Sequence, residues 1–157
     1  MDNFKMAVNL TLEKEGILSD NKDDAGGLTK YGISQAAYPG LDIANLSKED
    51  AIKIYKRDYW DKAQCLELPY PLDVMVFDTA VNHGVIKAVK ILQESLGLKA
   101  DGIVGQQTRA AARTAKNSIY TVFMINRLYA YTSAKSWPTF KEGWKNRLTK
   151  LAVEVDA

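Results

Sequence analysis

The chain has 157 residues, of which 46% are hydrophobic and 25% charged, as in an ordinary globular protein with one well-buried domain or two small ones packed together. No run of about 18 apolar residues occurs, which excludes a transmembrane helix. A single cysteine, Cys65, excludes an internal disulfide and a cysteine-rich zinc site, so it is expected to be a small buried apolar residue.

The formal charge is divided unevenly along the chain. Residues 1–79 contain 9 Lys and Arg against 14 Asp and Glu, a net charge of −5, whereas residues 80–157 contain 12 against 5, a net charge of +7. A basic half attracts an anionic polymer such as nucleic acid or cell wall, or it is an ordinary solvated surface. Charge alone leaves these alternatives open.

The spacing of apolar residues predicts a mainly helical protein, whose first helix covers residues 3–15. The segment 16–45 is rich in Gly, Asp and Asn, with a weak strand pattern around 28–33. Ser47, with acids in the turn after it, predicts the N-cap of a helix that continues to about Trp60. The predicted fold class is therefore mainly α, with a small irregular or β region after the first helix.

The second half continues the helical pattern. Helices are predicted to end near Gly84 and then to cover residues 85–96, 105–115, 118–134 and 138–155. Gly97 is predicted to close the helix before it at the C′ position. An apolar stripe on the last helix is expected to lie in the core: Phe140, Trp144, Leu148, Leu151 and Val155.

Glu15 is the candidate general acid. On a helical wheel it lies within about 20° of both Phe4 and Val8 on the apolar face, whereas Glu13 lies on the opposite, solvated side. It also lies at the C-terminus of the first helix, which Gly16 is expected to end. Partial burial and the negative end of the helix dipole both raise the pKa of a carboxyl group. A carboxyl that stays protonated near neutral pH suits a general acid, and the alternative is a structural glutamate paired with a buried Arg or Lys.

Asp24 and Thr29 follow Glu15 at positions i+9 and i+14. A polar, Gly-rich loop stays hydrated, so Asp24 is expected to be ionised and to complete the carboxyl pair that glycoside hydrolysis uses. The hydroxyl of Thr29 is suited to hold a water molecule. A calcium loop beginning at Asp20 would lack the required Gly and the bidentate Glu, so no metal is expected. The remaining alternative is a loop of Asx turns without chemistry.

One run of residues resembles glycoside hydrolase family 108: Glu15-Gly16, Asp23-Asp24, Gly26-Gly27, Thr29 and Tyr31-Gly32-Ile33. Members of this family include bacteriophage endolysins that act as N-acetylmuramidases and have a lysozyme-like fold. The resemblance implies that Glu15 is the catalytic acid, and similarity to other phage lysozymes implies that Asp24 and Thr29 assist it. The sequence departs from the family pattern at Ile17, Leu18, Ala25 and Lys30, which concerns sugar contacts near the loop more than the acid.

A second set of residues resembles the peptidoglycan-binding module that accompanies this family: Leu92-Gln93, Leu96-Gly97, Asp101-Gly102, Gly105, Thr108, Phe140, Gly143-Trp144 and Asn146-Arg147. The two resemblances together imply a hydrolase part over residues 1–90 and a helical peptidoglycan-binding part over residues 91–157. The two parts are expected to pack as one compact unit.

Other polar and aromatic residues have two interpretations each. Asp78 and Asn82 are four residues apart and share a helix face, and the resemblance implies that Asn82 reaches the sugar cleft, with helix capping as the alternative. Tyr31 is a candidate for stacking on a sugar ring, whereas Trp60 is expected in the core. His83, next to a helix end, is expected to have a structural or dipole role rather than a catalytic one.

The resemblance implies an endolysin-type lysozyme that hydrolyses the β-1,4 bond between N-acetylmuramic acid and N-acetylglucosamine. Peptidoglycan glycan strands are the expected partner of a monomer that needs no cofactor and binds no nucleic acid. The acids within the first 15 residues interrupt the apolar run of a signal peptide, so we expect synthesis in the cytoplasm and action on the cell wall after release. The alternatives are a lytic transglycosylase and a non-catalytic protein that binds peptidoglycan or regulates secretion.

Overall fold

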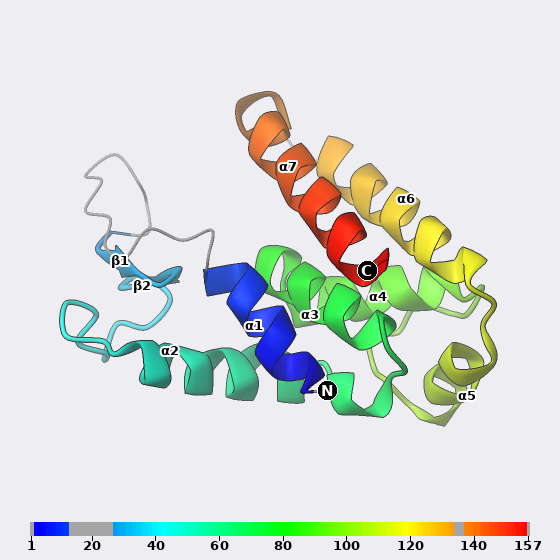
Figure 1. Ribbon diagram of the computed structural model, residues 1–157, viewed down its shortest axis with the longest axis horizontal. Helices are drawn as coiled ribbons and strands as arrows, with labels where there is room; N and C mark the ends of the chain where they lie inside the picture. The colour runs from blue at the N-terminus through cyan, green and yellow to red at the C-terminus, as the bar shows by residue number, and fades with distance from the viewer. Residues whose placement is uncertain (1, 13–26, 134–136, 157) are drawn as a thin grey trace. The chain divides into compact units, whose positions relative to one another are not determined.

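The computed structural model describes residues 2–12, 27–133 and 137–156, and Glu15 and Asp24 lie outside these ranges (Figure 1). The chain forms two compact units, Met1–Asp58 and Tyr59–Ala157. Over the described ranges the secondary structure consists of helices and one two-stranded sheet, which confirms the predicted fold class. No helix in these ranges has the length and apolar character needed to cross a membrane.

In the residues that are described, the first unit contains two α-helices and the sheet. Helix α1, Asn3–Leu12, buries Ala7, Val8, Leu10 and Leu12, so the predicted apolar face is the buried one. Helix α2, Lys48–Tyr55, begins as predicted, because the Ser47 hydroxyl accepts a hydrogen bond from the amide of Asp50 at 3.0 Å. A π-helical segment, Lys56–Asp61, continues directly from α2.

The predicted weak strand around residues 28–33 is two strands with a turn between them. Strand β1, Thr29–Lys30, pairs with strand β2, Ile33–Ser34, in antiparallel register. Tyr31 and Gly32 have φ angles of 52° and 76°, and this left-handed backbone ends β1 before the predicted strand is complete.

The second unit contains a 3-10 turn, Cys65–Glu67, and five α-helices: α3 Leu72–His83, α4 Val85–Ser95, α5 Gln106–Thr114, α6 Ser118–Thr132 and α7 Trp137–Asp156. Helix α3 packs on α4, α4 on α6, and α6 runs antiparallel beside α7 (Figure 1). Every residue from 72 to 80 is buried, as expected for a helix that is apolar on nearly all sides. The predicted helices of this half are confirmed.

The loop that joins α4 to α5 is tied to a buried glutamine. Gly97 has a φ of 70°, and the amides of Gly97 and Leu98 donate to the carbonyls of Glu94 and Gln93 at 3.1 and 2.8 Å, which confirms the predicted C′ position. The Gln93 amide nitrogen donates to Asp101 Oδ1 at 2.7 Å and to the Thr108 hydroxyl at 3.1 Å. Its amide oxygen accepts from the Gly102 amide at 2.8 Å. The Gln93 side chain thus joins three positions, Asp101, Gly102 and Thr108, and stabilises the loop between α4 and α5.

Trp60 and Cys65, both predicted from the sequence to be buried, lie in the core of the second unit. Trp60 is 4% exposed and contacts the ring of Phe77 at a centroid distance of 5.7 Å. Cys65 is fully buried, and burial raises the pKa of its thiol well above the usual value. On α7, Leu151 is buried, whereas Trp144, Leu148 and Val155 are half-buried.

Candidate functional site

Thr29 and Tyr31 lie on the same short hairpin of the first unit. Thr29 pairs with Ser34 and Lys30 with Ile33, so Tyr31 and Gly32 form the two-residue connection. Positive φ at both positions is typical of a type I′ turn, whose twist matches that of the strands. Glycine adopts this conformation without strain, whereas tyrosine has to offset about 1–2 kcal/mol.

A partly buried hydrogen bond holds the backbone of Tyr31 in this conformation. The hydroxyl of Tyr55, a side chain from α2 that is 2% exposed, donates to the Tyr31 carbonyl at 2.9 Å. Lys30 donates through Nζ to the Ala44 carbonyl at 2.8 Å, and the same nitrogen lies 5.8 Å from the centre of the Tyr31 ring. A strained residue that its surroundings hold in place is a feature of ligand-binding sites. The Tyr31 ring is half-buried, so part of it is open to solvent.

Thr29 presents a hydroxyl whose proton is already engaged. Its Oγ1 donates to the carbonyl of Gly27 at 3.2 Å, and its side chain is half-buried. A hydroxyl oxygen retains lone pairs when its proton is used, so Thr29 can accept a hydrogen bond from water or from a sugar hydroxyl. Glu15 and Asp24, the two predicted carboxyl partners of Thr29, lie outside the described residues, and their roles stay predictions.

Asn82 belongs to the second unit and lies near the end of α3. The donors around its amide assign the oxygen to the side that faces Arg147, where it accepts from Nη1 and Nη2 at 2.8 and 2.9 Å and also contacts Nε. The same guanidinium binds the Asp78 carboxylate, with Nη2 2.9 Å from Oδ1 and Nε 3.0 Å from that oxygen. Asp78 and Asn82 therefore share one helix face as predicted. The side-chain partner of Asn82 is a guanidinium of α7, and the end of α3 is closed by a backbone bond from Gly84 to Ala80.

Arg127 is a buried residue of this cluster that the sequence analysis did not single out. It lies on α6, is fully buried, and its Nη2 is 2.6 Å from Oδ2 of Asp78. Nη2 also donates to the Tyr131 hydroxyl at 2.9 Å. The signal is present in the sequence, because Ile119, Phe123, Arg127 and Tyr131 recur at every fourth position and are all buried. An arginine in the middle of an apolar stripe indicates a buried acidic partner.

His83 faces this cluster as a neutral ring. Its ring centre lies 4.5 Å from that of Tyr131, which in turn stacks on Trp144 at 4.5 Å. Burial and the positive charge of Arg127 lower the pKa of His83 to about 4. A neutral imidazole makes no favourable charge interaction with the helix dipole, so the expected structural role of His83 is one of packing.

Over the described ranges, no group of three His, Cys, Asp or Glu side chains is arranged to hold a metal ion. The polar side chains described above carry a hydroxyl group on Thr29, an amide on Asn82 and a carboxylate on Asp78, and the last two contact arginines. Such groups recognise hydrogen-bonding ligands directly.

Comparison with known proteins gives two consecutive matches along the chain. The model of the family described as glycosyl hydrolase 108 matches residues 8–84, and that of the predicted peptidoglycan domain matches residues 87–149. Among solved structures, the chain is similar to Brucella abortus SagA, with 30% sequence identity and a TM-score of 0.88. The similarity covers 97% of this chain and 92% of the SagA chain. A search of curated proteins finds no match.

Proposed function

Because this chain belongs to the glycosyl hydrolase 108 family and carries a peptidoglycan domain after the hydrolase segment, we propose that it hydrolyses the β-1,4 bond between N-acetylmuramic acid and N-acetylglucosamine. The family membership makes it a glycoside hydrolase, and the second domain makes peptidoglycan its polymer. The observation that carries the proposal is the presence of both matches in one chain, in that order. An endolysin-type lysozyme that acts on the cell wall combines these two parts.

We assign the chemistry to Glu15, Asp24 and Thr29. Glu15 protonates the leaving oxygen: the sequence pattern predicts that it lies on the apolar face at a helix C-terminus, a position that raises the pKa of a carboxyl group. Asp24, which the polar, Gly-rich sequence around it predicts to be ionised, stabilises positive charge on the sugar or orients the attacking water. Thr29 supports the proposal through its hydroxyl oxygen, which retains lone pairs to hold that water.

The strained turn at Tyr31 supports a role in substrate binding. Its backbone is held by the buried Tyr55 hydroxyl, so the position of the ring does not have to be fixed when a ligand arrives. For Asn82, the orientation assigned from its partners directs the amide oxygen toward Arg147 and the amide nitrogen away from the guanidinium. We assign that nitrogen as a donor to an acetamido or hydroxyl oxygen of the glycan.

We also propose that the hydrolase part extends over residues 1–90 and the peptidoglycan-binding part over residues 91–157. The change of family match between residues 84 and 87 supports this division. Asp78 is paired with Arg127 and Arg147 within the second unit, which supports packing of residues 59–90 of the first segment against the second segment.

The test is a zymogram with purified peptidoglycan, followed by turnover of soluble glycan fragments. Glu15→Gln keeps the shape of the side chain but donates no proton, so activity is expected to fall roughly 100-fold or more. Glu13→Gln is the matched control, because the helical wheel predicts that Glu13 lies on the opposite, solvated side, and it is expected to keep wild-type activity. Retention of more than about a tenth of the activity by a folded Glu15→Gln protein would remove Glu15 as the acid.

The reaction products separate hydrolysis from its main alternative. A lysozyme leaves a reducing end on N-acetylmuramic acid. A lytic transglycosylase leaves an anhydro sugar, and its mechanism needs no second carboxylate in the enzyme. Mass spectrometry of the digested glycan is expected to give the reducing product. Asp24→Asn is expected to lower activity by less than Glu15→Gln does, and an anhydro product with no effect of Asp24→Asn would favour the transglycosylase.

A further inference from the structure

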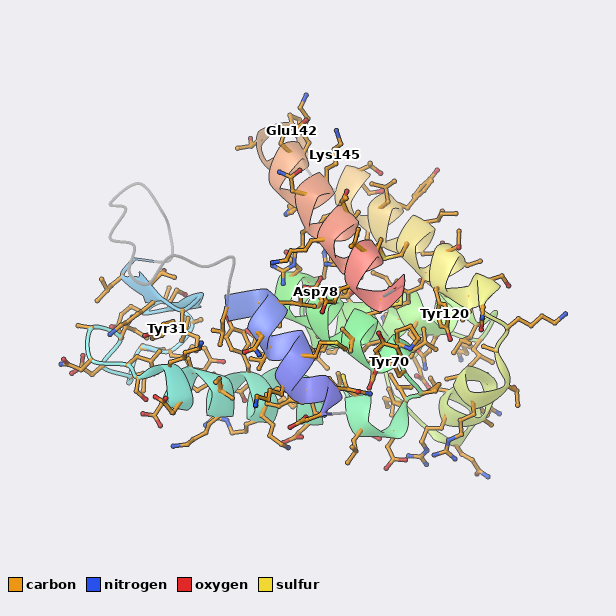
Figure 2. All side chains as sticks on the ribbon, viewed as in Figure 1. Tyr31, Tyr70, Asp78, Tyr120, Glu142 and Lys145 are labelled. Carbon is orange, nitrogen blue, oxygen red and sulfur yellow. The ribbon has the colours of Figure 1, made fainter. Side chains whose placement is uncertain are left out.

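The second unit has a groove of about 690 Å³ lined by side chains of α3, α6, α7 and the segment before α3. Tyr70 and Met75 line it from one side, and Asn117, Tyr120, Thr121 and Met124 from the other. Figure 2 labels Tyr70 beside the start of α3 and Tyr120 near the start of α6. Its volume lies within the range of small-molecule sites, roughly 300–1,000 Å³, so it admits one or two sugar rings.

The lining has the two chemical properties that a pyranose ring requires. Met124 and the two tyrosine rings offer apolar surface to the C–H face of a sugar, above the fully buried Met75. Asn117 and Thr121 offer an amide and a hydroxyl, and the tyrosines add two phenol groups, all of which hydrogen-bond sugar hydroxyls and acetamido groups. Tyr70 is 43% exposed, so its ring is accessible to a ligand.

Among the described residues, no ionised side chain lines the groove, and the charges that act on Tyr70 from nearby are the carboxylates of Asp73 and Glu154. A phosphate or carboxylate ligand would find no opposite charge there and would lose its hydration without compensation. Burial, together with the negative charges of Asp73 and Glu154, raises the pKa of Tyr70, so its phenol stays neutral as well. The groove therefore suits an uncharged polyhydroxylated ligand better than an anionic polymer, although the basic half of the chain carries a net charge of +7.

We propose that this groove binds N-acetylated sugars of the peptidoglycan strand and holds the protein on the wall independently of the catalytic step. The four residues on the α6 side all fall within the segment that matches the predicted peptidoglycan domain. The proposal rests on the proposed function for the identity of the polymer. It adds a location to the binding activity and assigns that activity to neutral stacking and hydrogen bonding rather than to surface charge.

The experiment measures co-sedimentation of the Glu15→Gln protein with purified sacculi, so that the wall stays intact during binding. In this background Tyr120→Ala is expected to weaken binding about tenfold, since it removes one aromatic contact. Tyr129→Ala is the matched control, because Tyr129 lies on the same helix, is 73% exposed and is not part of the groove lining. The control is expected to bind as the Glu15→Gln parent does.

A second variant keeps the test valid if Tyr120→Ala does not fold. Thr121 is exposed on α6, so Thr121→Trp fills the groove without removing a core contact and is expected to weaken binding to a similar extent. In both variants, turnover of short soluble fragments with Glu15 present is expected to stay at the wild-type value. This measurement separates the two proposals. If the wild type hydrolyses no fragment, the proposed function is contradicted, whereas the sedimentation data still test whether the groove binds the wall.

The salt dependence of binding to sacculi distinguishes the groove from the basic surface as the binding site. Binding through the groove is expected to change little between low and high salt, whereas binding through exposed charge weakens as the Debye length shortens from about 10 Å at 0.1 M to about 3 Å at 1 M. Parent protein that leaves the sacculi at high salt, with Tyr120→Ala and Tyr129→Ala bound alike at low salt, would assign binding to the basic surface and overturn the proposal. Absence of any binding by the parent would overturn it as well.

Discussion

Asp78 and Arg127 form an ion pair in which neither side chain is more than 4% exposed, with 2.6 Å between Oδ2 and Nη2. Removal of one partner from a buried pair leaves the other charge without compensation, at a cost of about 3–5 kcal/mol. Asp78→Asn is therefore expected to lower the free energy of unfolding by that amount, as measured by urea denaturation of the whole chain.

Glu67→Gln is the matched control for this substitution in the same unit. Glu67 lies 3.7 Å from Arg113, and both side chains are largely exposed. Exposed pairs contribute about 0–1 kcal/mol, so the control is expected to unfold close to the wild-type urea concentration. Equal effects of the two substitutions would show that the Asp78 pair contributes no more than a surface contact.

Gln93 provides a second prediction, on the loop between α4 and α5. Gln93→Glu replaces an amide donor by a carboxylate next to Asp101, whose carboxylate accepts from that amide at 2.7 Å. Lost hydrogen bonds and repulsion between the two carboxylates are expected to cost at least about 3 kcal/mol at pH 7. Part of this loss is expected to recover at pH 4, where one carboxyl binds a proton. Gln107→Glu, on the exposed first turn of α5, is expected to stay within about 0.5 kcal/mol of wild type at both pH values.

His83 gives the chain a predicted pH dependence of stability. The pKa is about 6.5 in an unfolded chain and about 4 in the folded protein, chiefly through burial and the nearby charge of Arg127. Between these values the unfolded state binds more protons, so the free energy of unfolding falls as the pH falls from about 6.5 to about 4. The loss attributable to His83 is expected to be about 1 kcal/mol between pH 7 and pH 5, since solvent screens a half-buried ring.

The measurement for His83 is the difference between wild type and His83→Gln in urea unfolding at pH 7 and pH 5. Glutamine does not titrate, so the variant is expected to lose less stability than the wild type over this interval. The other titrating groups contribute equally to both proteins and cancel in the difference. Parallel losses in the two proteins would mean that His83 is protonated in the folded state as easily as in the unfolded chain.

Thr29 is expected to act through its hydroxyl rather than its shape. Thr29→Ser keeps the oxygen that donates to Gly27, whereas Thr29→Val keeps the shape without it. Turnover of purified peptidoglycan is expected to stay within about twofold of wild type for the serine variant and to fall about tenfold for the valine variant, which loses one hydrogen-bonding group. A folded valine variant with wild-type turnover would remove Thr29 from the mechanism.

The sequence predicted the helices well because their ends depend on local chemistry. Ser47 caps the helix that follows because its hydroxyl reaches an amide three residues away, and Gly97 ends a helix because its backbone adopts a positive φ. Both effects involve neighbours in the chain. The apolar face of residues 3–12 was predictable for the same reason, since helical periodicity is a local property.

Features that depend on distant partners were not predictable in this way. Tyr31 adopts a left-handed conformation because Tyr55, 24 residues away, holds its carbonyl, and the single predicted strand became two as a result. Arg127 is buried because Asp78 lies opposite it on another helix. The groove between Tyr70 and Tyr120 is formed by segments 50 residues apart in the sequence. In each case the contact, rather than the residue type, determines the role.

The burial of Cys65 makes the protein a convenient host for chemical labels. It is the only cysteine of the chain, and its thiol is both inaccessible and held in the protonated, unreactive form. A cysteine introduced by Lys141→Cys, on the exposed surface of α7, would therefore be the single site that a maleimide dye modifies in the native protein. One fluorophore per molecule, at a chosen position, allows attachment of the enzyme to individual sacculi to be counted under a microscope without removing any natural residue of the core.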